Sequence, residues 1–326
     1  MSKVSVLVPT YKPNAQHLSE TLESLKAQSE TDWECIICDE PTDTDTHALV
    51  MDYLVDERFQ YHRNKKCLGI GGNWNECYAK SSANVIACLF QDDLWEPDYL
   101  ETALKIFSEH KEVGLISMHH KYQYDEELWT IEGYELVKKV QKEITPGVHK
   151  GKEILEWWLK RNMHPNIIGE PPFVVLRRQL MEEVGPFKEK MPQFLDVEYW
   201  LRCLQRTDWY YEAVSHGAFR VHGEAASAKN NESGEGLYDR LTVFEQLIKS
   251  LHGPLKKIAI KSRNRSVHDM IEKFLNRMKH GKGASSKGSG QVFSFVIKHP
   301  IIVGVGFVRA IIKKTTQTPP STSTHP

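Results

Sequence analysis

The sequence predicts an α/β protein whose mostly parallel sheet is flanked by helices. Short apolar runs alternate with stretches of helical periodicity through the first 118 of the 326 residues. The runs are apolar at nearly every position, as in strands that helices cover on both faces. Because repeated βα units favour parallel strands, one sheet is expected to run through this region.

The expected strands and helices follow one another along the chain. Apolar runs predict strands over residues 4–8, 33–38, 59–63, 85–90, 113–118 and 172–177. Apolar residues at helical spacing predict helices over 18–25, 49–54, 74–78, 98–110 and 196–205. The glycines at 69, 71 and 72 lack the spacing of phosphate-binding loops, so we interpret them as a turn.

Charge is divided unevenly along the chain. The 42 Lys and Arg nearly balance the 43 Asp and Glu overall, but residues 249–326 carry 15 basic side chains against only Asp269 and Glu272. The balance is therefore +13 in this region and −14 in residues 1–248. This pattern predicts an acidic catalytic body with a basic extension that seeks a polyanionic surface. We expect no nucleic-acid partner.

The cysteines and the N-terminus indicate a cytoplasmic protein. The six cysteines are scattered through apolar segments, and the Cys35-x-x-Cys38 pair has no second pair to complete a zinc site. We interpret all six as buried thiols in a reducing compartment. The chain enters its first strand directly, without a charged start followed by an apolar signal segment.

Asp92 and Asp93 follow the apolar run at 85–90. Two adjacent carboxylates repel each other unless a cation intervenes, and hard divalent metals prefer oxygen ligands with phosphate completing the shell. The alternative is a solvated turn that caps the next helix. Similarly, Asp196 and Glu198 begin the helix expected at 196–205, where Asp196 could be a cap.

Other polar residues follow the first two strands. Pro9, Thr10 and Tyr11 end the first strand, and Asp39 ends the second. The carboxyl ends of parallel strands share one edge of the sheet, where ligands bind. An aromatic ring, a hydrogen-bonding acid and an acid pair at one edge would suit a nucleoside diphosphate.

Seven segments carry a resemblance to a known family. In chain order they are VSVLVPTYKPN, ETLESLKAQSETDWE, IICDEPTDTDT, GIGGNWNECYAKSSANVIACLFQDDLWEPDYL, GEPPFVVLRRQLMEEVGPF, FLDVEYWLRC and FRVHGEAAS. Together they resemble the family-2 glycosyltransferases, which have the GT-A fold, over roughly residues 3–227. The sequence departs from the family pattern at Glu40, Pro41, Trp74 and Phe90, so the resemblance does not specify which nucleotide base is bound.

The resemblance implies a role for each matching residue. Pro9, Thr10 and Tyr11 would contact the nucleotide, Asp39 the base, and Asp92 the ribose and diphosphate. Asp93 would bind Mg²⁺ or Mn²⁺, with His222 near the metal. Asp196 would be the general base, and Glu170, Pro171 and Glu198 would line the acceptor side.

The expected function is that of an inverting, metal-dependent hexosyltransferase in cell-surface polysaccharide synthesis. It would move a sugar from a nucleotide-diphosphate donor, UDP first, to a hydroxyl of a saccharide or lipid-linked acceptor. A sugar nucleotidyltransferase remains an alternative, although residues 11–14 lack its glycine-rich triphosphate loop. A non-catalytic carbohydrate-binding protein remains the other alternative. Such a protein would tolerate loss of the base or the metal-binding acid, and this sequence has both.

The expected domains follow from these assignments. The catalytic domain would cover residues 1–237, with a nucleotide-sugar half (1–118) and an acceptor half (119–237). A basic helical extension (238–280), a flexible linker (281–291), an apolar and basic segment (292–314) and a disordered tail (315–326) would follow. The segment at 292–314 has charges near its middle, so we expect it to lie on an anionic membrane surface rather than span it. A helix docked on the catalytic body is the alternative.

Overall fold

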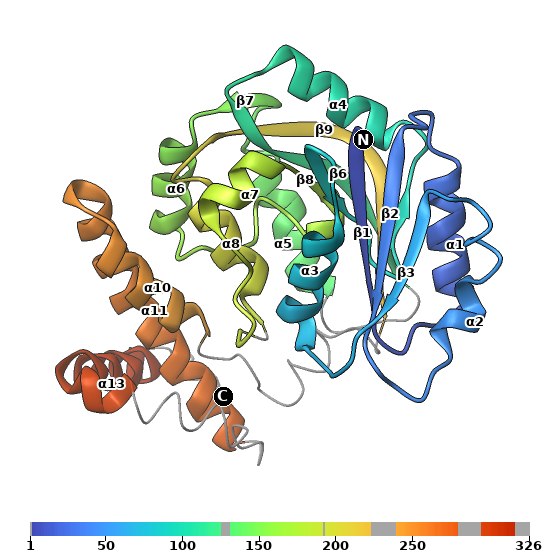
Figure 1. Ribbon diagram of the computed structural model, residues 1–326. Coiled ribbons are helices and arrows are strands. Elements are labelled where there is room, and N and C mark those ends of the chain that lie inside the picture. The colour runs from blue at the N-terminus through green and yellow to red at the C-terminus, as the bar shows by residue number, and fades with distance from the viewer. Residues whose placement is uncertain (1, 125–130, 192, 223–238, 280–294, 317–326) are drawn as a thin grey trace, which may run out of the picture. The chain divides into compact units, whose positions relative to one another are not determined.

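The computed structural model describes residues 2–124, 131–191, 193–222, 239–279 and 295–316 (Figure 1). The chain divides into two compact units, residues 1–158 with 163–228, and residues 159–162 with 229–326. The linker expected at 281–291 and most of the tail expected at 315–326 lie outside the described residues.

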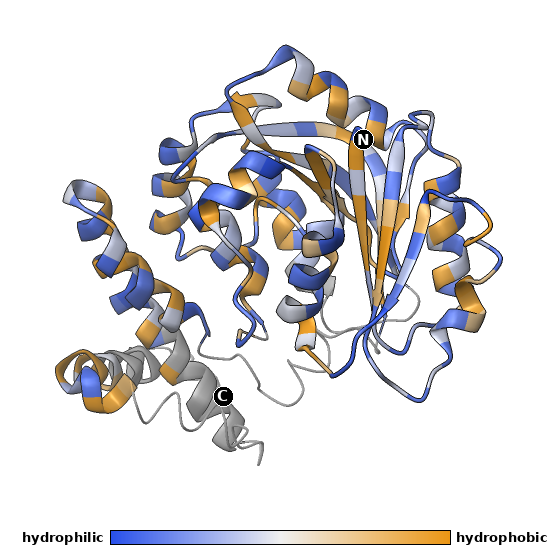
Figure 2. Ribbon diagram, in the orientation of Figure 1, coloured by the Kyte–Doolittle hydropathy of each residue, from blue (hydrophilic) through white to orange (hydrophobic). Residues whose placement is uncertain are grey.

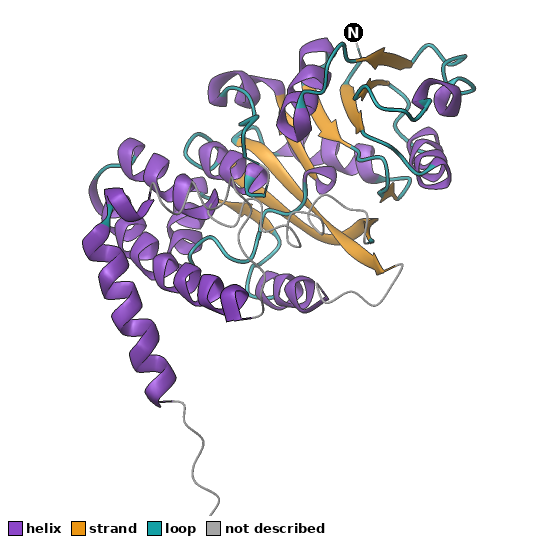
Figure 3. Ribbon diagram, turned by 90° about the horizontal axis from the view of Figure 1, so that it is seen from below, coloured by secondary structure: helices purple, strands orange, loops and turns teal. Residues whose placement is uncertain are grey.

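The first unit is an α/β domain built on one mixed sheet. The strand order is β3-β2-β1-β4-β8-β6-β9-β5, with β7 paired to β9. Strands β1 (Val4–Thr10), β2 (Trp33–Asp39), β3 (Phe59–Arg63) and β4 (Val85–Cys88) are parallel, which confirms the expectation for this half. Figure 3 shows the strands as one sheet bordered by helices.

The other half of the sheet differs from the expected parallel continuation. Strand β6 (Val113–Tyr124) does not pair with β4, because β8 (Val174–Arg177) lies between them and runs antiparallel to both. Strand β9 (Asp208–Val221) is parallel to β6, and β5 (Leu94–Trp95) and β7 (Gly147–His149) are antiparallel to β9. Hydrophobic periodicity shows that a segment is a strand, but it does not identify the strand's neighbour.

Helices connect these strands. The parallel half contains α1 (Ala15–Lys26), α2 (Thr46–Val50), α3 (Gly69–Lys80) and α4 (Tyr99–Glu109). The other half contains α5 (Ile131–Gln141), α6 (Gly151–Lys160), the 3-10 turn η1 (Pro171–Phe173), α7 (Arg178–Val184) and α8 (Leu195–Cys203). Five expected helices thus occur, as α1, α2, α3, α4 and α8 with shifted boundaries, whereas α5 and α7 were not among those expected.

The glycine cluster at 69–72 forms the first turn of α3, so its interpretation as a loop turn was incomplete. Gly69 has a φ of +75°, which glycine adopts without strain. A Cβ on Gly71 would lie 2.9 Å from the Lys188 carbonyl oxygen. Close packing as well as backbone freedom therefore requires glycine here.

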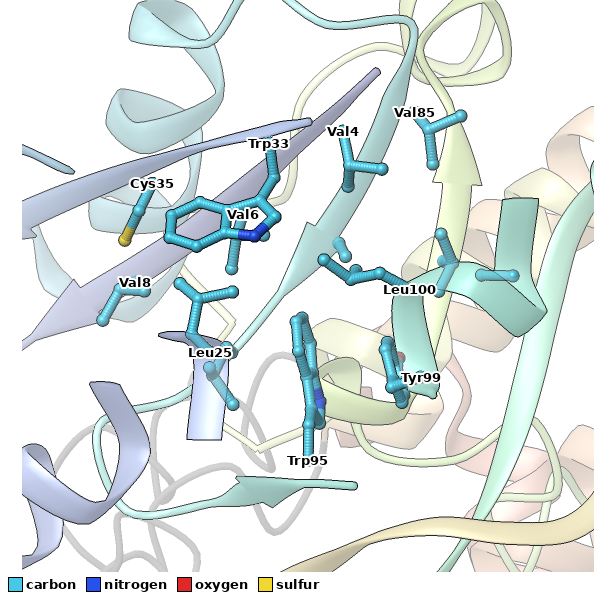
Figure 4. Packing of buried hydrophobic residues seen from close by; sticks show 14 of the residues in the cluster. Val4, Val6, Val8, Leu25, Trp33, Cys35, Val85, Trp95, Tyr99 and Leu100 are labelled. Atoms are coloured by element: carbon cyan, nitrogen blue, oxygen red, sulfur yellow. The ribbon is translucent and has the colours of Figure 1, made fainter. Parts of the chain in front are cut away.

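A buried apolar core holds β1, β2 and their helices together. Strand β1 is buried at almost every position, and Figure 4 shows Val4, Val6 and Val8 facing Trp33 and Leu25. Figure 2 shows the hydrophobic residues concentrated along these strands. Burial of such side chains stabilises the fold by about 1.5–3 kcal/mol each. Five of the six cysteines are buried as expected, and Cys67 is exposed, contrary to expectation.

One part of the core positions the segment before β8. The rings of Trp95 and Tyr99 stack with centroids 4.1 Å apart (Figure 4). Trp95 Nε1 and Tyr99 Oη donate to the carbonyl oxygen of Pro172, over 2.8 and 3.1 Å. These two buried bonds fix the η1 turn, and with it the neighbouring Glu170.

The second unit contains the helices α10 (Asp239–Ser250), α11 (Gly253–Lys279) and α13 (Pro300–Thr316), and residues 295–298 are helical as well. Leu241, Val267, Ile271, Phe295 and Val303 form its small apolar core. Among the described residues, no helix is long and apolar enough to cross a bilayer.

Candidate active site

Polar side chains gather at the edge of the sheet where β1, β2 and β4 end. Because β8 is antiparallel to β4, the residues just before β8 lie at the same edge. Strand β9 brings its last residues there as well, since the backbone N–H of Arg220 donates to Asp93 Oδ1 over 2.9 Å. Residues far apart in sequence thus form one site.

Asp39 forms the floor of this site at the end of β2. Its Oδ1 accepts from Thr10 Oγ1 over 2.9 Å, and its Oδ2 accepts from Tyr61 Oη over 3.0 Å. Burial and the bond to Asp39 raise the pKa of Tyr61 to about 12. Asp39 has no exposed surface, so in this conformation both of its oxygens bind hydroxyl groups of the protein and neither is accessible to a ligand.

Neighbouring residues fix the ends of β1 and β2, including two amides that sequence reasoning missed. Asn73 donates to the Thr10 and Cys38 carbonyls over 3.3 and 3.0 Å, and accepts from Asn64 over 2.9 Å. By contrast, Tyr11 is 54% exposed, which leaves its ring available for stacking. Pro9 is half-buried beside these residues.

Asp93 has a buried carboxylate oxygen without a hydrogen-bond partner among the described residues. The residue is fully buried, and its Oδ2 has no hydrogen-bond partner within the described part of the chain. Burial and then the charge of Asp92 raise the pKa of Asp93 well above its usual range, while the Arg220 N–H opposes this shift. A buried carboxylate oxygen without a donor is costly unless a cation or proton reaches it.

His222 and Arg220 lie next to the acid pair. His222 Nε2 is 2.8 Å from Asp92 Oδ2, which brings together the two residues that the sequence suggested near the diphosphate. The buried Arg220 donates from Nη2 to Glu20 over 2.6 Å. Its Nη1 is buried and has no partner among the described residues. Arg220 was missed, although it stands two residues before His222.

Asp93 and the side chains beside it could bind a divalent cation only if substrate phosphates completed the coordination shell of the cation. Within the described residues, no three His, Cys, Asp or Glu side chains are grouped to hold a metal by themselves. The partnerless oxygen of Asp93 is a suitable donor, with Asp92 and His222 beside it. Mg²⁺ typically binds one or two carboxylates together with substrate phosphates, and this donor set matches that pattern.

Glu170 occupies the middle of the site, together with two residues of β6. His120 Nε2 lies 3.2 Å from Glu170 Oε2, and Tyr122 Oη is 3.5 Å from Glu170 Oε1. The orientation of His120 and Glu170 does not allow a hydrogen bond between them. His120 Nε2 and Glu170 Oε2 therefore have no hydrogen-bond partner among the described residues. Burial and then Glu170 raise the pKa of Tyr122.

Asp196 lies in the first turn of α8 and is held by Asn166. Asn166 Nδ2 donates to Asp196 Oδ2 over 2.8 Å and to the Gly169 carbonyl over 2.9 Å, which ties the carboxylate to the segment that carries Glu170. Helix α8 is capped by Phe194, so Asp196 is not its N-cap. Asn166 was also missed by sequence reasoning.

Four carboxylates interact electrostatically in this site. Burial raises the pKa of Asp196 to about 7; the bond from the Val197 N–H opposes this, and Glu170 adds to it. The charge of Glu170 also raises the pKa of Asp93. Glu170 therefore links Asp92 and Asp93 at the end of β4 to Asp196 on α8.

Glu198 and Pro171 have structural partners. Glu198 is buried and receives bonds of 2.9, 3.1 and 2.9 Å from the Arg202 guanidinium, which itself donates to the carbonyls of Val184 and Pro186. Pro171 is buried and begins η1. The structure does not bring Glu198 into contact with the other acids, so we leave it out of the proposed site.

The role of Glu198 can be tested by Glu198→Gln. The amide cannot accept the full set of bonds from Arg202, so we expect the free energy of unfolding to fall by about 2 kcal/mol. Substrate affinities of the folded enzyme should not change. Thermal unfolding and steady-state kinetics measure the two effects, and a raised KM for the acceptor at unchanged stability would restore Glu198 to the acceptor side.

The comparisons with known proteins agree with this geometry. Residues 5–163 match the family model described as Glycosyl transferase family 2. This match covers just under half of the chain and, with the names and folds of similar proteins, supports a family-2 glycosyltransferase. The uncharacterized glycosyltransferase MJ1057 of Methanocaldococcus jannaschii is 25% identical over 65% of this chain and 67% of its own length.

Two other similar proteins have more informative names. The Escherichia coli protein WfgD, named as a UDP-Glc:alpha-D-GlcNAc-diphosphoundecaprenol beta-1,3-glucosyltransferase, is 30% identical over 32% of this chain and 40% of its own length. The mannosyltransferase PcManGT of Pyrobaculum calidifontis, solved with GDP-Man and Mn²⁺, has a TM-score of 0.59 at 13% identity. That match covers 98% of this chain and 88% of PcManGT, and it supports the fold.

These matches define how far the family assignment extends. In two of the curated relatives the matched region spans 62% and 67% of the relative's own length. The solved structures show that the first unit has the GT-A fold, and the family match supports a glycosyltransferase domain there.

Proposed function

We propose that this chain transfers a hexose from a nucleotide-diphosphate donor to a hydroxyl of a saccharide or lipid-linked acceptor. UDP is the favoured carrier, and the anomeric carbon is inverted. The observation that carries the proposal is the group of carboxylates Asp92, Asp93, Glu170 and Asp196 at one sheet edge. One buried acid with a partnerless oxygen (Asp93) and one base-type acid (Asp196) are what a single displacement needs.

The donor half of the site supports nucleotide binding in this proposal. The exposed ring of Tyr11 stacks on the base, while Asp39 acts indirectly, because it orients the hydroxyls of Thr10 and Tyr61. The partnerless Nη1 of Arg220 donates to a phosphate oxygen. Asp93 would hold Mg²⁺ or Mn²⁺, with His222 and Asp92 beside it. The cation would neutralise negative charge on the leaving diphosphate.

The acceptor half supports proton removal. Asp196 takes the proton from the acceptor hydroxyl, and the oxygen attacks the anomeric carbon on the face opposite the diphosphate. A base is most effective when its pKa lies near the working pH, and the pKa of Asp196 is about 7. Asn166 keeps the carboxylate in place, and Glu170 faces the acceptor.

The names of similar proteins support the choice of substrates. WfgD is named for a UDP-glucose donor and a lipid-linked acceptor, and PcManGT was solved with a GDP-linked sugar and Mn²⁺. We extend the acceptor class of WfgD to this chain and place the reaction in surface polysaccharide synthesis at the cytoplasmic face of a membrane. UDP ranks before GDP because the UDP-dependent relative has the higher identity.

A thermal-shift panel tests the donor assignment. We expect UDP with Mn²⁺ to raise the Tm most among UDP, dTDP and GDP, because a ligand at about 100 times its Kd stabilises the folded state by about 2.7 kcal/mol. Mn²⁺ alone and UDP with a chelator are the controls. A larger shift with a nucleoside triphosphate would favour a nucleotidyltransferase, and no shift with any nucleotide would contradict the proposal.

A further inference from the structure

Helix α13 in the second unit has an exposed apolar ridge. Ile301 is 81% exposed, Val305 48% and Val308 57%. Their spacing of four and three residues places them on one side of the helix. We call these three residues the α13 ridge; Ile297, which precedes α13, is 64% exposed as well.

The ridge is not the face with which α13 packs in its own unit. That face carries Val303, which is 5% exposed, and Gly306, where a Cβ would lie 2.7 Å from Ile271 Cδ1 on α11. Val303 and Val305 are separated by about 200° around the helix, given 3.6 residues per turn. The helix is therefore apolar on two opposite sides, and Val303 on one of them belongs to the apolar core of its unit.

Basic side chains border the ridge. Ile301 and Val305 line a hollow of about 240 Å³ together with Asn264 and His268 of α11. Positions 257, 261, 264 and 268 are separated by four, three and four residues. Lys257 and Lys261 therefore lie on the same side of α11 as Asn264 and His268. Both lysines are exposed.

The chain around the ridge is also positively charged. Lys298 is exposed one turn before Ile301 and Ile302. Glu245 on α10 is paired with Arg263 over 2.7 Å and with His299 over 3.3 Å, while α11 itself contains two acidic residues, Asp269 and Glu272. Residues 249–326 as a whole carry a balance of +13. An occupant of the ridge should therefore be apolar in its interior and negatively charged at its surface.

We propose that the α13 ridge inserts into the interfacial layer of a bilayer that contains anionic lipid. The apolar side chains enter the acyl boundary, and Lys257, Lys261 and Lys298 contact the headgroups. An apolar face flanked by lysines has the character of helices that lie in the plane of a membrane. The surface would hold the enzyme beside lipid-linked acceptors, but its lipid binding does not depend on sugar transfer.

Flotation of the full chain with vesicles tests the proposal without donor or acceptor. We expect binding to vesicles with about 30% phosphatidylglycerol and at least tenfold weaker binding to pure phosphatidylcholine, since the lysines add electrostatic attraction only to the former. Raising the salt from about 0.1 to 0.5 M should weaken binding, because salt screens exposed charges. No flotation with either vesicle would overturn the proposal.

Two variants separate the apolar and basic parts. Ile301→Gln with Val305→Gln, and separately Lys257→Glu with Lys261→Glu, should each reduce binding at least tenfold at unchanged Tm. The matched control is Val55→Gln with Val214→Gln, which changes valines that are 89% and 63% exposed in the first unit and should not affect binding. Unchanged binding by either test variant would overturn the assignment.

Other occupants of the ridge would give different results. If a second copy covers it, the chain sediments as a dimer, the glutamine variant as a monomer, and neither floats. If the catalytic unit covers it, the glutamine variant lowers the Tm and the full chain does not float. Both results contradict the proposal, and neither bears on whether the first unit transfers sugars.

Discussion

Asp93→Asn is expected to lower turnover of the nucleotide-sugar donor at least about 1000-fold, since a bound cation contributes several kcal/mol to a transition state that builds charge on the leaving group. Asparagine keeps an oxygen for the Arg220 N–H but removes the buried charge beside Asp92. The partnerless oxygen becomes an amide, which repels a cation. Turnover is measured as release of nucleoside diphosphate.

A second readout distinguishes this loss from misfolding. Asparagine at this buried position removes a carboxylate with no donor on Oδ2, so the Tm without nucleotide should not fall. The rise in Tm with UDP and Mn²⁺ over UDP alone should disappear. Asp52→Asn, at an exposed position, is the matched control and should retain both turnover and this rise. Full activity of Asp93→Asn, or of the wild type in excess chelator, would refute the proposed role of Asp93.

Asp196→Asn is expected to cut turnover about 100-fold or more with nearly unchanged donor affinity, which is the scale of a positioned general base. Asparagine can still accept from the Val197 N–H, so the turn of α8 should be retained. Glu198→Gln, two residues on in the same helix, is a matched control with the opposite pattern: lowered stability and retained turnover. A collapse of donor binding in Asp196→Asn would make Asp196 a structural residue instead.

The pH dependence provides an independent check of Asp196. Only the deprotonated carboxylate accepts a proton, and the pKa in the folded state is about 7, so kcat should rise with pH and level off above about 7. In the unfolded chain the pKa is about 3.9, so the folded state binds more protons between about pH 4 and 7, and stability falls as the pH rises through this window. Asparagine does not titrate, so the Tm of Asp196→Asn relative to the wild type should rise as the pH increases from about 4 to about 8. A Tm difference that is the same at both pH values would contradict this.

Much of the site could be predicted because its residues follow strands. Asp39 and Asp92–Asp93 come directly after apolar runs, and the carboxyl ends of parallel strands share one edge. Strand-end reasoning does not extend to Glu198, which the resemblance assigned to the acceptor side, since a carboxylate in a helix gives no sign of its partner. Arg202 lies four residues further on, and this spacing is compatible with a buried pair as well as with an exposed one.

The sequence by itself determined the parallel half of the sheet, the acids at its edge and the basic, apolar C-terminal region, because local periodicity and composition encode these features. Only the tertiary structure decided that β8 lies between β4 and β6, and that Glu170 consequently reaches the edge that carries Asp93. Likewise, it decided that Asn166 holds Asp196. The physical reason is that strand order and side-chain pairing depend on contacts between segments distant in sequence, which no local pattern specifies.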